Sequence, residues 1–130
     1  MAASATGNYI QDKGYDAAAA LTKYRAVKFS AVNVVTPVTA VTDVVVGIVQ
    51  HDVTAGEITK GKGASVRREG ISLMEASEAI AAGQLVSMVT DGRAAVAAAT
   101  ERVIGVCDQP AGAAGEYISI KLDLPGTILA

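Results

Sequence analysis

The stretches Val46-Gly47-Ile48-Val49 and Ile104-Gly105-Val106-Cys107 decide the fold, because each is a short apolar run that contains one glycine. Such a run is typical of a strand that is buried on both faces, and its glycine indicates a bulge or the close approach of another backbone. The two runs lie 58 residues apart, and similar landmarks flank both in the same order. These landmarks pair Ala20-Leu21, Val27 and Phe29 with Ala79-Ile80, Val86 and Met88, and Ala55-Gly56-Glu57 with Ala114-Gly115-Glu116. Order and spacing together indicate an internal repeat.

The repeated unit predicts the fold class. One unit of strands and turns cannot bury its apolar face alone, whereas two units that face each other can form a small sandwich or a closed barrel. We therefore predict an all-β fold, a small β-sandwich or barrel built from two similar halves at about residues 21–70 and 79–124. A single β domain would span residues 21–130. Helix is expected only as short turns, such as one over Ser77 to Ala81.

The first 20 residues have a different character, because loop-forming residues dominate them and no apolar period is long enough for a core element. We predict an extended N-terminal arm over residues 1–20. Tyr9, Ile10 and Tyr15 stand among the loop formers as possible anchors on a partner. Ordering such an arm on a partner costs conformational entropy. The alternative interpretation is an N-terminus that remains disordered.

Composition excludes several classes of function. The chain has 130 residues, which fits one domain, and a formal net charge of −2. Its basic residues are spread along the chain rather than clustered, so nothing indicates a nucleic-acid partner. No apolar run approaches the roughly 18 residues that indicate a membrane span. The single cysteine, Cys107, cannot form an internal disulfide and is expected to be a small buried hydrophobic residue.

The sequence offers no convincing catalytic or metal site. The one histidine, His51, is followed by Asp52, but adjacent side chains of an extended chain point to opposite sides. One histidine and one cysteine cannot supply the usual zinc ligands. The segment from Gly56 to Gly63 has the glycine and lysine spacing of a phosphate-binding loop, but Gly63 stands where that loop requires Ser or Thr. We therefore expect no enzyme activity, no cofactor and no metal, and a lysine- and glycine-rich hairpin tip over residues 56–63.

The second half of the chain resembles a known family. The order and spacing of its segments, more than any one motif, make the chain similar to the capsid decoration (cement) proteins of tailed bacteriophages. In the first half, the segment from Asn33 to Pro37 replaces an Asp-Gly turn, which leaves its strand count open. The segments that carry the resemblance are Ala79-Ile80-Ala81-Ala82-Gly83-Gln84-Leu85-Val86, Asp91-Gly92-Arg93, Val103-Ile104-Gly105-Val106, Ala114-Gly115-Glu116-Tyr117-Ile118 and Ile120-Lys121-Leu122.

The resemblance implies a structural protein that binds the outer surface of a phage head and stabilises contacts between major capsid subunits. Its partners would be the major capsid protein and further copies of itself, with trimers slightly favoured over dimers. The protein would be made in the host cytoplasm and would reside on the outer capsid surface of the virion. Tyr9, Ile10 and Tyr15 are then the candidate capsid-contact residues. The run from Val44 to Val49 is expected to be central in its sheet or covered by a neighbouring subunit.

Two alternatives remain open at this stage. One is a carbohydrate- or receptor-binding β module on a virion or cell surface, which would need an exposed aromatic or polar groove. The other is a small hydrolase that uses His51.

Overall fold

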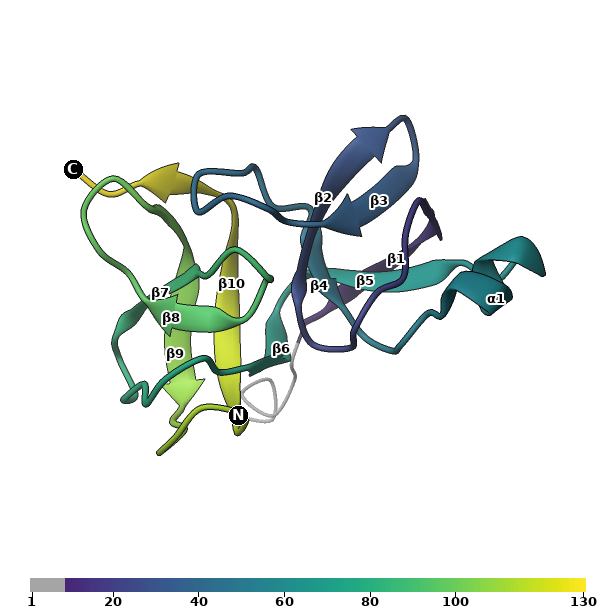
Figure 1. Ribbon diagram of the computed structural model, residues 1–130. Coiled ribbons are helices and arrows are strands. Elements are labelled where there is room, and N and C mark those ends of the chain that lie inside the picture. The colour runs from purple at the N-terminus through teal and green to yellow at the C-terminus, as the bar shows by residue number, and fades with distance from the viewer. Residues whose placement is uncertain (1–8) are drawn as a thin grey trace, which may run out of the picture.

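A computed structural model describes residues 9–130 and is almost entirely β (Figure 1). The strands of the first half are β1 (Gln11–Ala17), β2 (Ala26–Ala31), β3 (Val34–Pro37), β4 (Gly47–Val49) and β5 (Ala64–Glu69). They close into a barrel in the order β1-β3-β2-β4-β5. The second half contains β6 (Ile71–Glu75), β7 (Leu85–Met88), β8 (Ala94–Val96), β9 (Arg102–Gln109) and β10 (Tyr117–Ile128), in a sheet of order β6-β10-β9-β7-β8. The predicted fold class is confirmed.

The two halves are built in the same way. When β6 to β10 are matched to β1 to β5 in chain order, the neighbours in the second sheet repeat those around the barrel. Hydrogen bonds outside the strands also recur: the Tyr24 amide donates to the Val49 carbonyl at 2.7 Å, and the Gly83 amide donates to the Cys107 carbonyl at 2.8 Å. The structure therefore confirms two similar halves. They begin at β1 and β6, so the first unit starts earlier than the predicted residue 21.

Backbone conformation follows the repeat as well. Gly83 and Gly92 have φ values of 87°, and the residues 59 positions earlier, Tyr24 and Asn33, both have φ of 62°. Glycine adopts positive φ without steric cost, whereas asparagine and especially tyrosine do so less readily. The Asp-Gly turn signal is thus present only in the second half, although both halves make the same turn.

The halves differ in how they close. In the barrel, parallel pairing of β1 with β3 closes the sheet, and the Asp16 amide donates to the Asn33 carbonyl at 3.0 Å. In the second half, Ala76 still forms a parallel bridge with Ala94, but the groups equivalent to the Asp16 amide and the Asn33 carbonyl bond to the first half instead. The Glu75 amide donates to the Tyr24 carbonyl, and the Ala26 amide donates to the Gly92 carbonyl, both at 2.9 Å. These bonds, with the Arg25–Glu75 ion pair at 3.3 Å, fasten the two lobes seen in Figure 1.

Two apolar cores stabilise the molecule. One lies inside the barrel and contains residues such as Tyr15, Val35 and Val66. The other fills the second half and continues into the junction. The first half contributes Ala26, Val38, Val45 and Ile48 to this second core. The junction is therefore part of the hydrophobic core, and its burial stabilises both halves together.

Several local predictions were wrong. Residues 11–17 of the predicted arm form β1 of the barrel. The segment from Ser77 to Ala81 does not form a helical turn, since Ile80 pairs with Ala111 in an isolated bridge. Helix α1 (Ala55–Thr59) occupies the first part of the stretch expected to be a hairpin tip. The run from Val44 to Val49 was predicted correctly in part: β4 lies between β2 and β5, and residues 45–49 are buried. Only residues 47–49 form a strand, however, and Val44 is 57% exposed.

Helix α1 begins with a capping box. The Glu57 amide donates to Thr54 Oγ1, and the Thr54 amide donates to the Glu57 carboxylate, at 3.2 and 3.0 Å. Lys62 Nζ lies 2.7 Å from the same carboxylate. The bonds from Lys62 and Thr54 lower the pKa of Glu57 from 4.5 to about 2. Because the folded-state pKa is depressed, this contribution to stability is complete above pH 4.5 and is lost as the pH falls toward 2.

We therefore expect the Glu57 carboxyl to titrate with a midpoint near pH 2 in the folded protein. In Lys62→Ala, which removes the first of these bonds, the midpoint should move toward 4.5. Side-chain NMR chemical shifts during an acid titration measure both values. An unchanged midpoint in the variant would show that Lys62 does not hold the carboxylate in solution.

Candidate docking surface

His51 has a structural role in this fold. The Ser65 amide donates to His51 Nε2 at 3.0 Å, so Nδ1 carries the proton and donates to the Asp52 carbonyl at 3.1 Å. Both ring nitrogens are therefore engaged by backbone groups. The Asp52 carboxylate instead accepts from the Lys23 amide at 2.8 Å. The arrangement joins the chain after β4 to the start of β5 and leaves no ring nitrogen to act as a general base.

Cys107 is 2% exposed, as its apolar surroundings in the sequence predicted. Its thiol donates to the Gln109 carbonyl at 3.3 Å, and burial raises the pKa of the thiol. A raised pKa keeps the thiol protonated and therefore poorly nucleophilic. Over residues 9–130, no three His, Cys, Asp or Glu side chains gather in a way that could hold a metal ion. The same residues include no helix that is long and apolar enough to cross a membrane.

The structure separates the three predicted contact residues. Tyr9 is 84% exposed and Ile10 is 46% exposed, so both remain available to a partner. Tyr15 is only 4% exposed; it belongs to the barrel core and packs edge-to-face on Phe29, with ring centroids 5.5 Å apart. Its ring is therefore not accessible in this conformation. The segment that precedes residue 9 lies outside the described residues.

Tyr9 and Ile10 lie at the connection between the halves. A Cβ atom added at Gly70, which joins β5 to β6, would meet the Tyr9 carbonyl oxygen and the Ile10 side chain. Gly70 also has φ of 93°, a conformation that glycine adopts readily. The next residue, Gln11, pairs with Glu69 of β5. The start of the described chain is thus held against the junction, with the Tyr9 ring in solvent.

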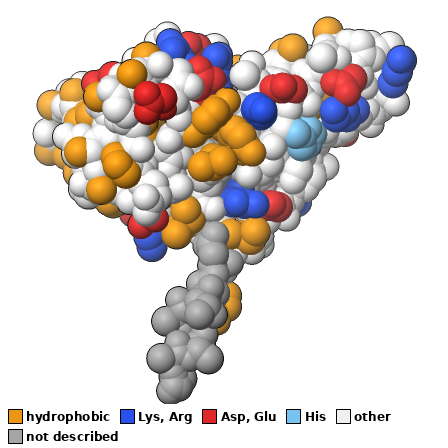
Figure 2. Space-filling view, turned by 90° about the horizontal axis from the view of Figure 1, so that it is seen from below, with side chains coloured by type: hydrophobic (Ala, Val, Ile, Leu, Met, Phe, Trp, Pro, Cys, Tyr) orange, Lys and Arg blue, Asp and Glu red, His pale blue; other side chains and the backbone are white. Residues whose placement is uncertain are grey.

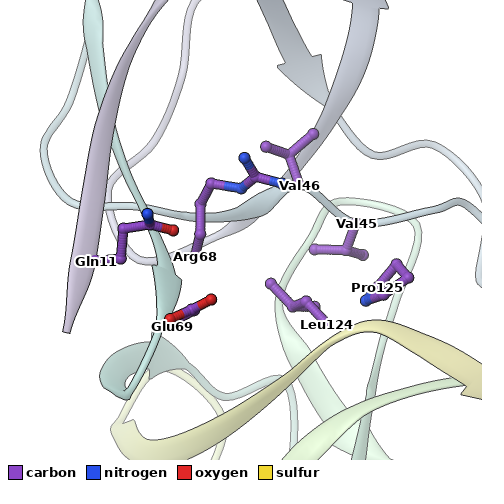
Figure 3. Close-up of a pocket in the computed structure, with 7 residues that line it drawn as sticks. All are labelled: Gln11, Val45, Val46, Arg68, Glu69, Leu124 and Pro125. Atoms are coloured by element: carbon purple, nitrogen blue, oxygen red, sulfur yellow. The ribbon is translucent and has the colours of Figure 1, made fainter. Parts of the chain in front are cut away.

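A hollow of about 350 Å³ adjoins this segment (Figure 3). Its polar side consists of Gln11, Arg68 and Glu69 from the barrel, and Leu124 and Pro125 of β10 lie across from them. The Arg68 side chain forms no hydrogen bond or ion pair with any other described residue. Its guanidinium group is therefore free to donate hydrogen bonds to a carboxylate of another protein. Val45 and Val46 complete the lining.

Exposed apolar side chains also occupy the outer face of the second sheet. Leu85 of β7 pairs with Val106 of β9, and these residues are 44% and 38% exposed. On the same face of this sheet, Leu73 of β6 and Tyr117 of β10 are each 42% exposed. Figure 2 shows one face of the molecule, on which apolar side chains gather between the lobes with charged side chains around them. Contiguous exposed apolar residues of this kind typically mark protein interaction sites.

Comparisons with known proteins give one family match and a similar fold. The family model for phage cement proteins matches residues 50–122 of the chain. A search among curated proteins gives no match. Among solved structures, the chain is similar to the crystal structure of the N base of the head fiber gp8.5 in bacteriophage phi29. That similarity has a TM-score of 0.67 at 16% sequence identity, and it covers 94% of this chain and 100% of the other.

Proposed function

Because this chain belongs to the phage cement protein family, we propose that it binds the outer surface of a phage head and stabilises contacts between major capsid subunits. The observation that carries the proposal is the family match over residues 50–122, which includes β5 to β9 and the first half of β10. The fold supports a structural role, since polar side chains such as His51, Arg25 and Glu57 join strands or cap a helix. Synthesis in the host cytoplasm and location on the outer capsid surface belong to the same proposal.

The capsid contact that we propose consists of Tyr9, Ile10 and the hollow beside them. A tyrosine that is 84% exposed can bury a large apolar surface on binding. Arg68 and Glu69 line the adjacent hollow and supply charges of both signs. An apolar centre with a polar rim is typical of protein interfaces. Tyr15, which is buried in the barrel, is excluded from this contact.

We further propose that the protein acts as a homo-oligomer, with trimers slightly favoured over dimers. A capsid presents many equivalent sites, and an oligomer that engages several of them gains affinity without any new type of contact. An oligomer whose copies contact different capsid subunits then bridges those subunits. A weak individual contact is sufficient under these conditions.

The proposal predicts that Tyr9→Ser/Ile10→Ser loses head binding without loss of stability. Removing two exposed apolar anchors should weaken binding of each copy by about 10- to 100-fold. Cosedimentation of purified protein with undecorated heads measures occupancy, and thermal unfolding checks the fold. Ile128→Ser is the matched control, since Ile128 is 47% exposed but lies at the end of β10.

Wild-type protein should saturate at a fixed number of copies per head, and the control should behave in the same way. Equal occupancy by the double variant would remove Tyr9 and Ile10 from the contact. Failure of the wild-type protein to bind its own undecorated heads would contradict the proposed function itself.

A further inference from the structure

The repeat makes it possible to compare the outer surfaces of the two halves residue by residue. In the first half, Ala26 of β2 pairs with Ile48 of β4, and both side chains are fully buried at the junction with the second half. The residues 59 and 58 positions later are Leu85 and Val106, which pair in the same way. These two are 44% and 38% exposed. The second half therefore presents to solvent the same surface that the first half buries.

The element that covers Ala26 is the turn between β7 and β8. Gly92 at this turn is buried, and its carbonyl accepts from the Ala26 amide at 2.9 Å. The equivalent turn in the first half joins β2 to β3 and carries Val32 and Asn33 at the positions of Asp91 and Gly92. Asp91 is held by Arg93 at 2.9 Å, whereas Val32 is 95% exposed. The first half thus presents an apolar version of the covering turn.

From these equivalences we propose that copies of this chain associate head to tail, with the β2–β3 turn of one copy on the Leu85 and Val106 surface of the next. The proposal deepens the homo-oligomeric part of the proposed function and rests on it. The two surfaces differ from each other, so the contact is heterologous and leaves one free surface at each end of an open chain. Closure into a ring satisfies both surfaces in every copy.

A second copy fits this surface because every copy carries the complementary β2–β3 turn in its first half. The first and second halves dock through one pair of surfaces, and the equivalent pair remains exposed at the opposite ends of the repeat. The polar contacts at the junction have counterparts too. The Arg25–Glu75 ion pair corresponds to Gln84 and Asp16, which can form a hydrogen bond between copies. The second half has Leu85 where the first half has Ala26, and the larger side chain adds apolar area to the exposed surface.

The hydrogen bond that closes the barrel makes the contact between copies differ from the junction between the halves. The Asp16 amide donates to the Asn33 carbonyl within the barrel, whereas the equivalent groups of the second half bond to Tyr24 and Ala26. The contact between copies therefore relies on side chains rather than on the two backbone bonds of the junction. Association between copies is expected to be reversible on dilution, unlike the docking of the halves.

Two substitutions, one on each surface, test the arrangement. Val32→Asp places at the turn a carboxylate without a partner, because Val34 stands where the second half has the Arg93 that pairs with Asp91. Leu85→Asp places a charge on the receiving surface. Each should weaken association about 100-fold, because a carboxylate would be buried against apolar side chains. Native mass spectrometry and light scattering give the mass of each species. Ile128→Asp is the control, and Val32→Ser and Leu85→Ser replace the aspartates if either variant fails to fold.

Wild type and control should form one oligomer of more than two chains, and each variant should be monomeric. An equimolar mixture of the two variants should form dimers and nothing larger, because each contributes one intact surface. A monomeric wild type, variants that still assemble, or a mixture that restores the full oligomer would each overturn the proposal. Head binding is measured separately. If the wild type is monomeric and Leu85→Asp nevertheless abolishes head binding, this surface contacts the capsid instead of a second copy.

Discussion

Replacing Gly105 with alanine is expected to lower the free energy of unfolding by about 3 kcal/mol. Gly105 lies in β9 between β7 and β10, and a Cβ atom there would collide with the Lys121 carbonyl oxygen and approach the Ile120 side chain. The first obstacle is backbone of the neighbouring strand, so a change of rotamer cannot relieve it. Gly47 has the equivalent place in the first half, where a Cβ atom would meet the Arg67 carbonyl.

Urea unfolding followed by circular dichroism measures the effect, and Gly14→Ala is the matched control. Gly14 also lies in a strand, but a Cβ atom there would have nothing within 4 Å. The control should change stability by only about 0.5 kcal/mol in either direction. If Gly105→Ala unfolds at the wild-type urea concentration, the close approach of β9 and β10 is wrong.

Ile48→Ala is expected to destabilise the protein by a similar amount, about 3 kcal/mol. Ile48 is fully buried and belongs to the core that joins the halves, so truncation leaves a cavity at the junction. Its repeat equivalent, Val106, is 38% exposed. Val106→Ala should therefore cost less than about 1 kcal/mol in the isolated chain, with its main effect on association between copies.

The same unfolding experiment, performed at low protein concentration, compares this pair. Dilution keeps association from contributing to the apparent stability. Equal losses in Ile48→Ala and Val106→Ala would mean that the two surfaces are equally buried within one chain. That result would remove the asymmetry between halves on which the head-to-tail contact depends.

Much of the fold could be predicted because its signals are local and repeated. The alternation over Tyr117 to Leu122 predicts a strand, and the structure extends that strand to Ile128. The two glycine-containing apolar runs, 58 residues apart, are equivalent strands of two similar halves. Their glycines mark close backbone approaches, as the sequence indicated.

Other elements escaped prediction for physical reasons. Strand β1 reads Gln-Asp-Lys-Gly-Tyr-Asp-Ala, and only Tyr15 and Ala17 are buried, so no apolar alternation revealed it. Its pairing with β3 and β5 is long-range and leaves no local signal. Helix α1 had a usable signal that was overlooked, the Thr54 and Glu57 spacing of a capping box. In the second half only a single bridge joins Ala76 to Ala94, and the bond equivalent to that between Asp16 and Asn33 is replaced by bonds to Tyr24 and Ala26. Sequence patterns do not specify these contacts.

The candidate site could be predicted only in part. The order of segments in the second half led to the phage cement family, which the family match confirms. Tyr9 and Ile10 are exposed beside a hollow, and their role stays a prediction. The burial of Tyr15 could not be predicted, because an aromatic residue among loop formers can face either solvent or a core. Its neighbours in the barrel are also distant in sequence. The surfaces at Val32 and Leu85 became visible only when the halves could be compared in three dimensions.

The most direct test of the central claim is a cryo-electron microscopy reconstruction of undecorated phage heads after incubation with the purified protein. We expect density for the two-lobed β body at a fixed set of positions on the outer shell, spanning adjacent capsid subunits, with Tyr9 and Ile10 at the shell. Heads that remain bare at saturating protein, or density confined to the interior, would contradict the account.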